Sequence, residues 1–518
     1  MNRTRILLLA SAAALLAPPG TNGEELRGRV VDAQTGEPIA RARVAIHVVP
    51  KDSQPADLIL LTDVAGTFGV KNLPDGAAQL SYSKPGYLNG NATAPPNTSS
   101  AVEKQAPIVI RLVRQAVIEG SILDDSGTGV PFASVQLFRY GIVDGLRHIQ
   151  PVNGAQADES GEFRIFGLSA GGYFVGAKAQ SQPLRNSKKL VYAPTFYPEA
   201  SEINGAQLIA LQPGTEEHVR IRVRTVPGRQ LRGRLTSGQN GGIFLRPQEP
   251  DRIPLAPDAN WTWDPAGGGF TASGVPAGAY VVEATTQIDG QQRRFMKAVI
   301  VDDTDLEGIV LEPVPLRELT GRVTVDGVAA SRQDVGYIGL RSSGNSVGAQ
   351  LEEDGSFRFR ALPPDYYHVS VSSGGSRYVR SIRQGGRDVQ WTAIEIGEPP
   401  PDPLEIELSS GGATLEGIVP DSGSFTPIVV ALFRRVGDEF IFEKQAFANG
   451  ALVPVNGRPA QFSMQCIAPG EYVVVAWPSD AEIEYAKPDF LRQAAAFGKT
   501  IQVGEGARLT VVLDRLLR

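Results

Sequence analysis

The sequence has a single cysteine, Cys466, and four histidines in 518 residues. One cysteine cannot form a disulfide bond within the chain, so hydrophobic cores must hold its folds together. Cys466 lies in the apolar stretch AQFSMQCIAPGEYVVVAW, which predicts that it is buried. The histidines lack the spacing of zinc ligands, so we predict no metal site. They are His47, His148, His218 and His368.

The sequence also shows little of the apolar periodicity that predicts long helices. The chain contains 57 glycines and 38 prolines, which loosen or break helices but suit turn-rich β structure. Apolar residues make up 42% of the chain, enough for real cores. We expect one short helix, over residues 488–497, because a proline opens an alanine-rich stretch that ends near Gly498.

The first residues, MNRTRILLLASAAALLAPPGTNGEE, resemble a secretory signal peptide. Arg3 and Arg5 precede an apolar run of about a dozen residues, which is short for a bilayer span. Small residues precede Glu24, so we expect cleavage after residue 23 and export to the periplasm, the outer surface or the medium. An uncleaved anchor is the alternative. No later run of 18 apolar residues predicts a transmembrane helix.

The formal net charge is −6. Nucleic-acid-binding proteins favour basic patches, so this mildly acidic balance argues against a nucleic acid as the partner.

Self-similarity is the main signal in the sequence. An opening phrase of the type LRGRVVD occurs five times, and each copy is followed by an aromatic strand, a turn and a second alternating strand. The opening glycines are Gly28, Gly120, Gly233, Gly321 and Gly417. The first aromatic position is Phe68, Phe163, Phe270, Phe357 and Phe462, and the second is Tyr173, Tyr280, Tyr367 and Tyr472 in all units but the first.

In the copy DESGEFRIFGLSAGGYFVGAKA, Asp158 and Gly161 suit a tight turn. Phe163 then opens one strand and Tyr173 the returning strand, so the phrase predicts a hairpin. The alternative is a cation site at Asp158 and Glu159. The third and fifth units lack these carboxylates, which favours the turn.

Each unit closes with period-two alternation, as in PIVIRLVR from Pro107, which marks a strand with one buried face. We therefore predict an all-β chain: a signal peptide and a tandem array of about five Ig-like or transthyretin-like β-sandwich domains. The predicted ranges are residues 1–23 for the signal peptide and 24–114, 115–226, 227–314, 315–409 and 410–518 for the sandwiches.

The opening LRGRVVDAQTGEPIARARVAI and its copy VIEGSILDDSGTGVPFASVQLF resemble the carboxypeptidase regulatory-like domain. The resemblance implies a transthyretin-like (prealbumin-like) β-sandwich in secreted bacterial proteins. It implies no peptidase activity, because the name comes from a domain attached to the peptidases. Related folds bind carbohydrate, but fold alone is weak evidence for function.

No residue pattern predicts catalysis or a cofactor. Ser346 in GNSVG matches G-x-S-x-G, but the next residues lead into a strand turn rather than a helix, so we interpret the match as chance. We find no phosphate-binding loop or dinucleotide fingerprint. The prediction is therefore a non-enzyme with no catalytic residue, no metal and no cofactor.

Two aromatic groups are candidate ligand-binding residues, because exposed aromatic rings stack on sugars or anchor protein partners. NWTWDP places Trp261 and Trp263 on one strand face. YAPTFYP gathers Tyr192, Phe196 and Tyr197 in an expected long loop. The alternative is that both groups fill or cap a sandwich core.

Three functions remain open from the sequence. The first is a non-catalytic, exported binding or surface-scaffold protein, with an unidentified protein or glycan ligand at the cell envelope. The second is a carbohydrate-binding protein that uses the exposed aromatics. The third is an accessory subunit of an envelope peptidase or hydrolase.

Overall fold

The computed structural model describes most of the chain after residue 23. The described residues are 24–50, 56–73, 76–94, 108–143, 145–179, 190–237, 242–249, 252–264, 268–288, 291–342, 345–420, 427–448, 460–479 and 481–517. The predicted signal peptide lies outside them. Contacts divide the chain into two compact units. The first ends at Leu112, and the second runs from Val113 and also contains Gly86–Leu88.

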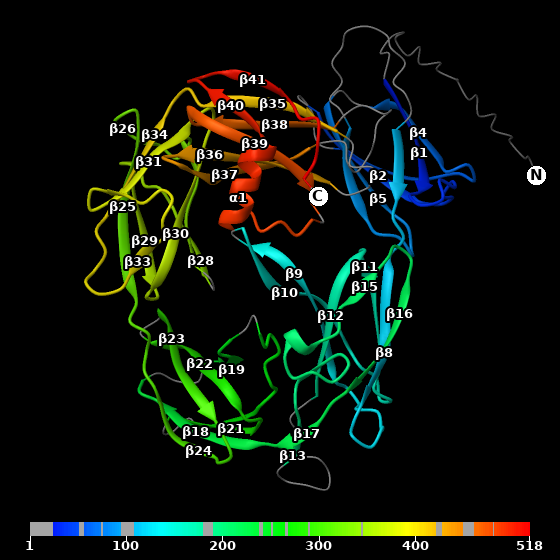
Figure 1. Ribbon diagram of the computed structural model, residues 1–518, viewed down its shortest axis with the longest axis vertical. Helices are drawn as coiled ribbons and strands as arrows, with labels where there is room; N and C mark the ends of the chain where they lie inside the picture. Colours follow the sequence, from blue (N-terminus) through cyan, green and yellow to red (C-terminus); the bar gives the residue numbers. More distant parts are fainter. Residues whose placement is uncertain are drawn as a thin grey trace, which may run out of the picture. The chain divides into compact units, whose positions relative to one another are not determined.

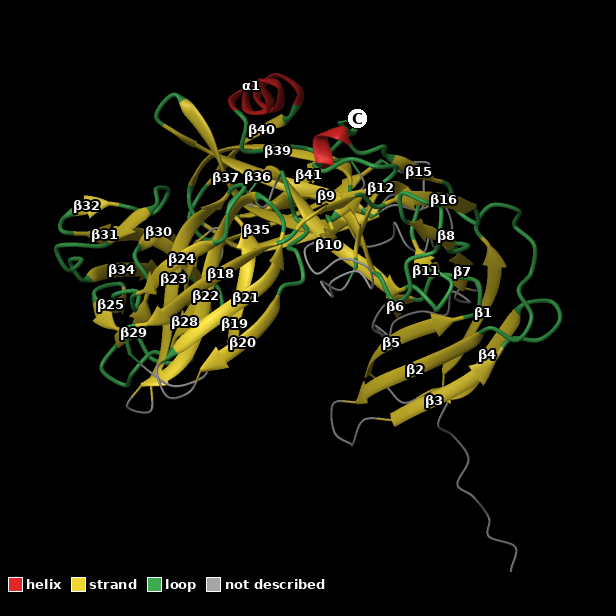
Figure 2. Ribbon diagram, turned by 90° about the horizontal axis from the view of Figure 1, so that it is seen from below, coloured by secondary structure: helices red, strands yellow, loops and turns green. Residues whose placement is uncertain are grey.

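Strands dominate both units, and α1 (Pro488–Phe497) is the one α-helix among the described residues (Figure 1). Its bounds confirm the predicted helix over 488–497. No helix in the described part of the chain is both long and apolar enough to cross a membrane. The chain is a tandem array of all-β sandwiches, as the sequence predicts (Figure 2).

We number the sandwiches 1 to 5 in chain order. Sandwich 1 has the sheets β4-β1-β7 and β3-β2-β5-β6. Their bounds are β1 Glu24–Asp32, β2 Arg43–Pro50, β3 Ala56–Leu61, β4 Thr67–Leu73, β5 Gly76–Ser83, β6 Gly90–Ala94 and β7 Ile108–Leu112.

Sandwich 2 has the sheets β11-β8-β16 and β10-β9-β12-β14, with β15 also on β12. Their bounds are β8 Ala116–Leu123, β9 Ser134–Val143, β10 Leu146–Gln156, β11 Glu162–Leu168, β12 Gly171–Lys178, β14 Thr195–Phe196, β15 Ile209–Leu211 and β16 Glu216–Arg222. The short strands β13 (Leu190–Tyr192) and β17 (Thr225–Pro227) pair with each other, and η1 (Ile203–Gly205) is a 3₁₀ turn.

Sandwich 3 has the sheets β20-β21-β18-β24 and β19-β22-β23. Their bounds are β18 Arg229–Leu235, β19 Gly242–Pro247, β20 Asn260–Asp264, β21 Gly269–Val275, β22 Gly278–Ile288, β23 Gln291–Val301 and β24 Leu306–Leu311.

Sandwich 4 has two sheets, with the strand orders β26-β25-β34-β31-β32 and β28-β27-β30-β33. In the first sheet, β29 also pairs with β25. Their bounds are β25 Arg317–Val325, β26 Val328–Ala329, β27 Val335–Ser342, β28 Asn345–Ala349, β29 Ser356–Leu362, β30 Asp365–Ser373, β31 Tyr378–Gln384, β32 Arg387–Asp388, β33 Ile394–Ile396 and β34 Leu404–Ser409.

Sandwich 5 has the sheets β38-β35-β41 and β37-β36-β39-β40. Their bounds are β35 Ala413–Val419, β36 Ile428–Val436, β37 Glu439–Ala448, β38 Ala460–Ile467, β39 Gly470–Pro478, β40 Lys499–Val503 and β41 Arg508–Val512. Helix α1 packs on the outer face of its second sheet.

One pairing pattern recurs in all five sandwiches. The strand that carries the opening glycine pairs antiparallel with the strand that carries the repeated phenylalanine, and parallel with the closing strand of the sandwich. This confirms the predicted closing strands. The five predicted residue ranges stay a prediction.

The hairpin predicted between the repeated Phe and Tyr strands is wrong. In sandwich 2, β11 pairs with β8 and β12 pairs with β9, so the turn between them crosses from one sheet to the other. A hairpin and a crossing show the same alternation of apolar residues. Here Phe163 and Tyr173 enter one core from opposite sheets, and both are buried.

A β-bulge precedes this crossing. The register shifts at the end of the Phe-bearing strand, and the residue four positions after the phenylalanine has a positive φ in sandwiches 2 to 5. These residues are Gly167, Gly274, Ala361 and Cys466. A bulge of this kind bends the strand and increases its twist, which directs the chain toward the second sheet.

Candidate functional site

The repeated aromatic residues are the first candidates for chemistry, because the chain repeats them most faithfully. All five phenylalanines are buried, and so are the four tyrosines. They lie between the two sheets of their sandwiches, as the folding interpretation of the phrase requires.

Each opening glycine lies directly opposite a repeated phenylalanine. The register pairs are Gly28–Phe68, Gly120–Phe163, Gly233–Phe270, Gly321–Phe357 and Gly417–Phe462. A Cβ atom on Gly321 would lie 2.7 Å from the carbonyl oxygen of Leu404 and closer still to the ring of Phe357. The glycine therefore leaves the space that the aromatic ring occupies.

Each repeated tyrosine closes the turn that precedes it. Its hydroxyl donates to the carbonyl oxygen four residues earlier in the chain, which satisfies a buried polar group at the sandwich end. The distances are 2.9 Å for Tyr173 to Ser169, 3.1 Å for Tyr280 to Pro276, 3.0 Å for Tyr367 to Pro363 and 2.7 Å for Tyr472 to Ala468. Burial raises the pKa of Tyr280 to about 12, so this hydroxyl stays protonated.

The acidic residues of the phrase act within turns. Asp158 Oδ1 accepts the backbone N–H groups of Ser160 and Glu162 at 2.8 and 2.9 Å. Gly161 has a φ of +80°. Asp63 accepts hydrogen bonds from the Thr67 hydroxyl and backbone, which hold the pKa of Asp63 below its usual value. The sequence prediction of a turn is therefore confirmed at these carboxylates.

Trp261 and Trp263 lie on β20 with both side chains against the core of sandwich 3. The rings of Trp261 and Phe270 are 6.0 Å apart. Trp263 lies directly opposite Phe270, and its indole nitrogen is buried without a hydrogen-bond partner among the described residues. Both side chains are partly buried against this core, and this packing favours the core alternative over a stacking platform.

The YAPTFYP segment forms short strands and tight turns instead of the expected long loop. Phe196 is fully buried in a cluster with Phe138 and Phe174, so the prediction of an exposed aromatic is wrong for Phe196. Thr195 and Phe196 form β14 and pair with Ala177 and Gly176 of β12. Alternation in the sequence does not reveal this pairing. Tyr192 and Tyr197 are partly buried against the core of sandwich 2, and their role in binding stays a prediction.

Cys466 corrects another expectation. It is partly exposed, not buried, and its thiol contacts the carbonyl oxygen of Gly375 at 2.9 Å. Its φ of +60° at the bulge explains the difference, because the bulge turns the side chain out of the alternating pattern.

The remaining polar candidates do not converge. Ser346 lies within strand β28, opposite Arg341, and not at a strand-to-helix turn. His47 and Asp57 form a surface pair at 2.6 Å, and His218 lies 3.9 Å from Glu119. Within the described ranges, no group of three or more His, Cys, Asp or Glu residues is arranged to hold a metal ion.

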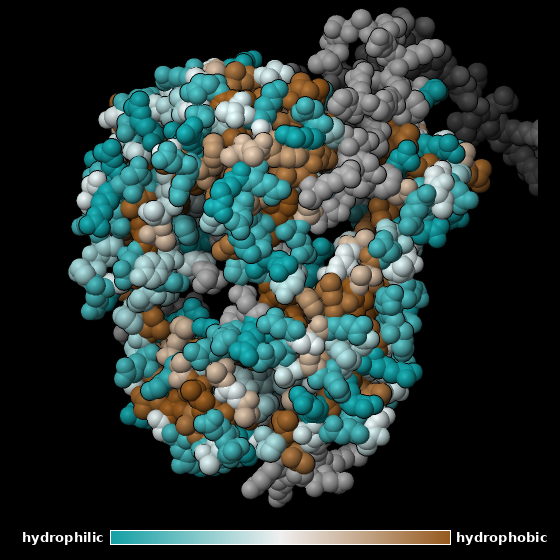
Figure 3. All heavy atoms as spheres, in the orientation of Figure 1, coloured by the Kyte–Doolittle hydropathy of each residue, from teal (hydrophilic) through white to brown (hydrophobic). Residues whose placement is uncertain are grey.

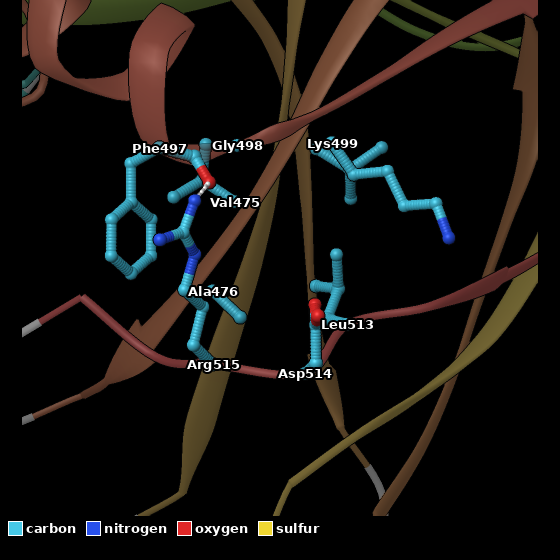
Figure 4. Close-up of a pocket in the computed structure, with 9 residues that line it drawn as sticks. Val475, Ala476, Phe497, Gly498, Lys499, Leu513, Asp514 and Arg515 are labelled. Atoms are coloured by element: carbon cyan, nitrogen blue, oxygen red, sulfur yellow. Dashed lines mark hydrogen bonds between the residues drawn. The ribbon is translucent and has the colours of Figure 1, made fainter.

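Sandwich 5 has a hollow of about 260 Å³ beside the end of α1 (Figure 4). The guanidinium of Arg515 lies 4.0 Å from the ring centroid of Phe497 and donates to the Phe497 carbonyl oxygen at 2.9 Å. The Lys499 ammonium donates to the Val512 carbonyl at 3.2 Å. These two contacts fasten the C-terminal segment to the end of α1 and to the start of β40.

The visible surface is mainly hydrophilic, with apolar residues in scattered patches (Figure 3). Scattered apolar side chains are normal on a folded protein and need no ligand to explain them.

Comparison with known families adds one identification, and it concerns sandwich 1. Residues 25–106 match the carboxypeptidase regulatory-like domain. The match confirms the resemblance on which the fold prediction rests, and it covers β1 to β6. No curated protein matches the chain.

Several solved structures align with between 39% and 96% of the chain. A streptococcal ancillary pilin shares 12% identity and covers 56% of this chain and 100% of its own, with a TM-score of 0.19. The Bacillus anthracis TIE protein shares 10% identity and covers 96% of this chain and 75% of its own, with a TM-score of 0.16. The shaft pilin SpaA from Lactobacillus rhamnosus GG shares 12% identity and covers 39% of this chain and 97% of its own, with a TM-score of 0.20. Scores this low carry no argument about function, so the carboxypeptidase regulatory-like match stands alone.

Proposed function

We propose that the chain is a non-catalytic, exported protein whose sandwiches bind or display a ligand at the cell envelope. One observation carries the proposal: the residues that the chain repeats are engaged in folding. Four of the five opening glycines make room for a phenylalanine ring, and Gly120 makes room for the backbone of Val219. The tyrosine hydroxyls close turns and the aspartates accept backbone N–H groups. The repeated residues therefore maintain the same sandwich fold in each unit, and the surface residues can differ between units.

The test combines a turnover assay with a binding assay on the purified chain. We expect no hydrolysis of peptidase or glycosidase substrates above background, together with saturable binding to the isolated envelope of the producing cell. Hydrolysis that purifies with the chain and is lost in Ser346→Ala or in one of the histidine variants would contradict the proposal.

Export rests on the predicted signal peptide. The expected N-terminus of the protein recovered from the envelope or the medium is Glu24, which N-terminal sequencing determines. Recovery of the chain with an intact Met1 in the cytosolic fraction would contradict export.

The carbohydrate alternative now depends on Tyr192 and Tyr197, because Phe196 is buried and the tryptophans pack on a core. A glycan array with the wild-type chain and the Tyr192→Ala and Tyr197→Ala variants separates the two functions. Glycan binding that is lost in folded variants would favour the carbohydrate function, and an array without signal would leave the protein ligand as the better proposal.

A further inference from the structure

The edge strand β3 of sandwich 1 is unusually apolar. It lies at one end of the sheet β3-β2-β5-β6 and reads ADLILL, with Asp57 as its one charged residue (Figure 2). Ile59 and Leu61 are 61% and 59% exposed. A strand edge of this kind is a template for pairing with another chain.

The same chain protects the corresponding edges of three other sandwiches. Strands β10, β28 and β37 pair with β9, β27 and β36 of sandwiches 2, 4 and 5, as β3 pairs with β2. Strand β10 contains Arg147 and Pro151, and β37 contains charged residues and a bulge. Strand β28, one residue shorter than β3, includes Gly348 and has Val347 as its single large apolar residue. Charges, proline, bulges and short length all block edge pairing. Strand β3 has one acidic residue, but it contains no basic residue, no proline and no bulge.

The ladder shows which backbone groups of β3 are not bonded to β2. The backbone N–H of Thr62 donates to Ala42 at 3.0 Å in the register that pairs Arg43 with Leu61. Hydrogen-bonded pairs alternate along an antiparallel ladder. The N–H and C=O groups of Asp57, Ile59 and Leu61 therefore point away from β2, toward the open edge.

We propose that β3 pairs antiparallel with β3 of a second copy of this chain, about a two-fold axis at Ile59. Ile59 then lies opposite Ile59 of the second copy, and Asp57 lies opposite its Leu61. Every outward backbone group of these three residues finds a partner in this register. The exposed faces of Ile59 and Leu61 become cross-strand contacts, which stabilise sheets. The inference does not depend on the function proposed above.

Charge placement favours a second copy over an unrelated peptide. The two-fold axis sets the two Asp57 carboxylates at opposite ends of the paired strands, so they do not repel. Arg43 lies beside Leu61 in the register. Asp57, which contacts His47 of its own copy at 2.6 Å, also comes within two strand spacings of Arg43 of the other copy, about 10 Å between backbones, which a long arginine side chain can span. The strand is self-complementary in backbone, apolar contact and charge.

Sedimentation equilibrium of the purified full chain over a range of concentrations tests the proposal. We expect a reversible monomer–dimer equilibrium for the wild type and loss of the dimer in Ile59→Lys, because a charged edge residue opposes pairing. Ile59→Pro should also lose the dimer. It removes only an outward N–H, so it leaves the ladder with β2 intact.

The matched control is Val64→Lys, which adds the same charge at a turn residue that is 88% exposed and outside β3. It should dimerise like the wild type, and all variants should keep the wild-type circular dichroism spectrum and unfold cooperatively. A wild-type chain that stays monomeric throughout would overturn the proposal. So would a dimer that persists in folded Ile59→Lys, or one that is lost equally in Val64→Lys.

Discussion

At the residue scale, Tyr367 tests the role of the repeated tyrosines. Its side chain is fully buried, and its hydroxyl donates to Pro363. Tyr367→Phe should lower the free energy of unfolding of sandwich 4 by about 1 kcal/mol, because the buried carbonyl loses its donor. Hydrogen exchange of the β29 and β30 amides measures the change.

The neighbouring tyrosine provides the control for this substitution. Tyr366 is 62% exposed, so Tyr366→Phe should leave the exchange rates of sandwich 4 unchanged. Equal effects of the two substitutions would show that the buried hydrogen bond does not stabilise the turn.

Ala361 tests the bulge. Its φ of +58° is unfavourable for a residue with a Cβ, whereas the equivalent positions in sandwiches 2 and 3 are Gly167 and Gly274. Ala361→Gly should stabilise sandwich 4 by about 0.5 to 1 kcal/mol, since relief of the left-handed conformation exceeds the added chain entropy. Slower hydrogen exchange in β29 is the expected result.

The reverse substitution is its control. Gly274→Ala should destabilise sandwich 3 by a similar amount. Faster exchange in β29 of Ala361→Gly would show that the left-handed backbone at Ala361 does not destabilise the bulge.

At the element scale, spacing in the sequence predicted most of the architecture. Repeated glycine, phenylalanine and tyrosine positions predicted five sandwiches, and period-two alternation predicted the closing strands. A proline before an alanine-rich stretch predicted α1. These signals are local, because each depends on backbone preference or on which face of one strand is buried.

Pairing between strands could not be predicted in the same way. The Phe and Tyr strands alternate alike whether they pair with each other or cross between sheets, so the hairpin prediction failed. Strand β20 pairs with β21 instead of with β19, and this choice places Trp261 and Trp263 against a core. Among the candidate binding residues, Phe196 is buried and contradicts the expected exposure, and the binding roles of the others stay predictions. The apolar edge of β3 was not predicted, because a sequence does not show which strands lie at an edge.

Glu443 shows how a bulge places a charge. The register of β36 and β37 shifts at Phe433, which leaves Glu443 as the extra residue of the bulge. Its side chain is 16% exposed and lies 3.2 Å from the Tyr472 hydroxyl and 3.8 Å from Arg434. Burial raises the pKa of Glu443 above 4.5, and Arg434 only partly opposes this.

The raised pKa sets a pH dependence. Between pH 4.5 and the higher pKa of the folded state, the folded chain binds the proton more tightly than the unfolded chain does. Glu443 therefore contributes to the free energy of unfolding at low pH, and this contribution is lost as the pH rises through that interval. Glu443→Gln, which does not titrate, should stabilise sandwich 5 at neutral pH, and the gain should vanish in acid. Urea unfolding at both pH values measures it, and a variant that is less stable at neutral pH would contradict the burial argument.

At the scale of the whole molecule, Leu255 links two sandwiches of the second compact unit. It belongs to the segment between β19 and β20 and is buried among Phe138, Phe174 and Phe196 of sandwich 2. Ion pairs from Arg252 to Glu202 at 2.6 Å and from Lys178 to Asp258 at 3.1 Å flank the contact.

Leu255→Asp should detach this segment, because a carboxylate cannot remain in the apolar cluster without a partner. Limited proteolysis should then cut within residues 252–259, a region protected in the wild type. Leu208→Asp is the control, since Leu208 is 52% exposed and should not create a new cleavage site. Cleavage at the same rate in wild type and in Leu255→Asp would show that the contact does not order the segment.

The central claim is that the repeated aromatic residues join the two sheets of each sandwich and carry no chemistry of their own. Hydrogen exchange of the Phe357→Leu variant tests it most directly. We expect faster exchange in β25, β29 and β34 of sandwich 4, with unchanged exchange in β8, β11 and β16 of sandwich 2. Wild-type exchange throughout sandwich 4 would contradict it.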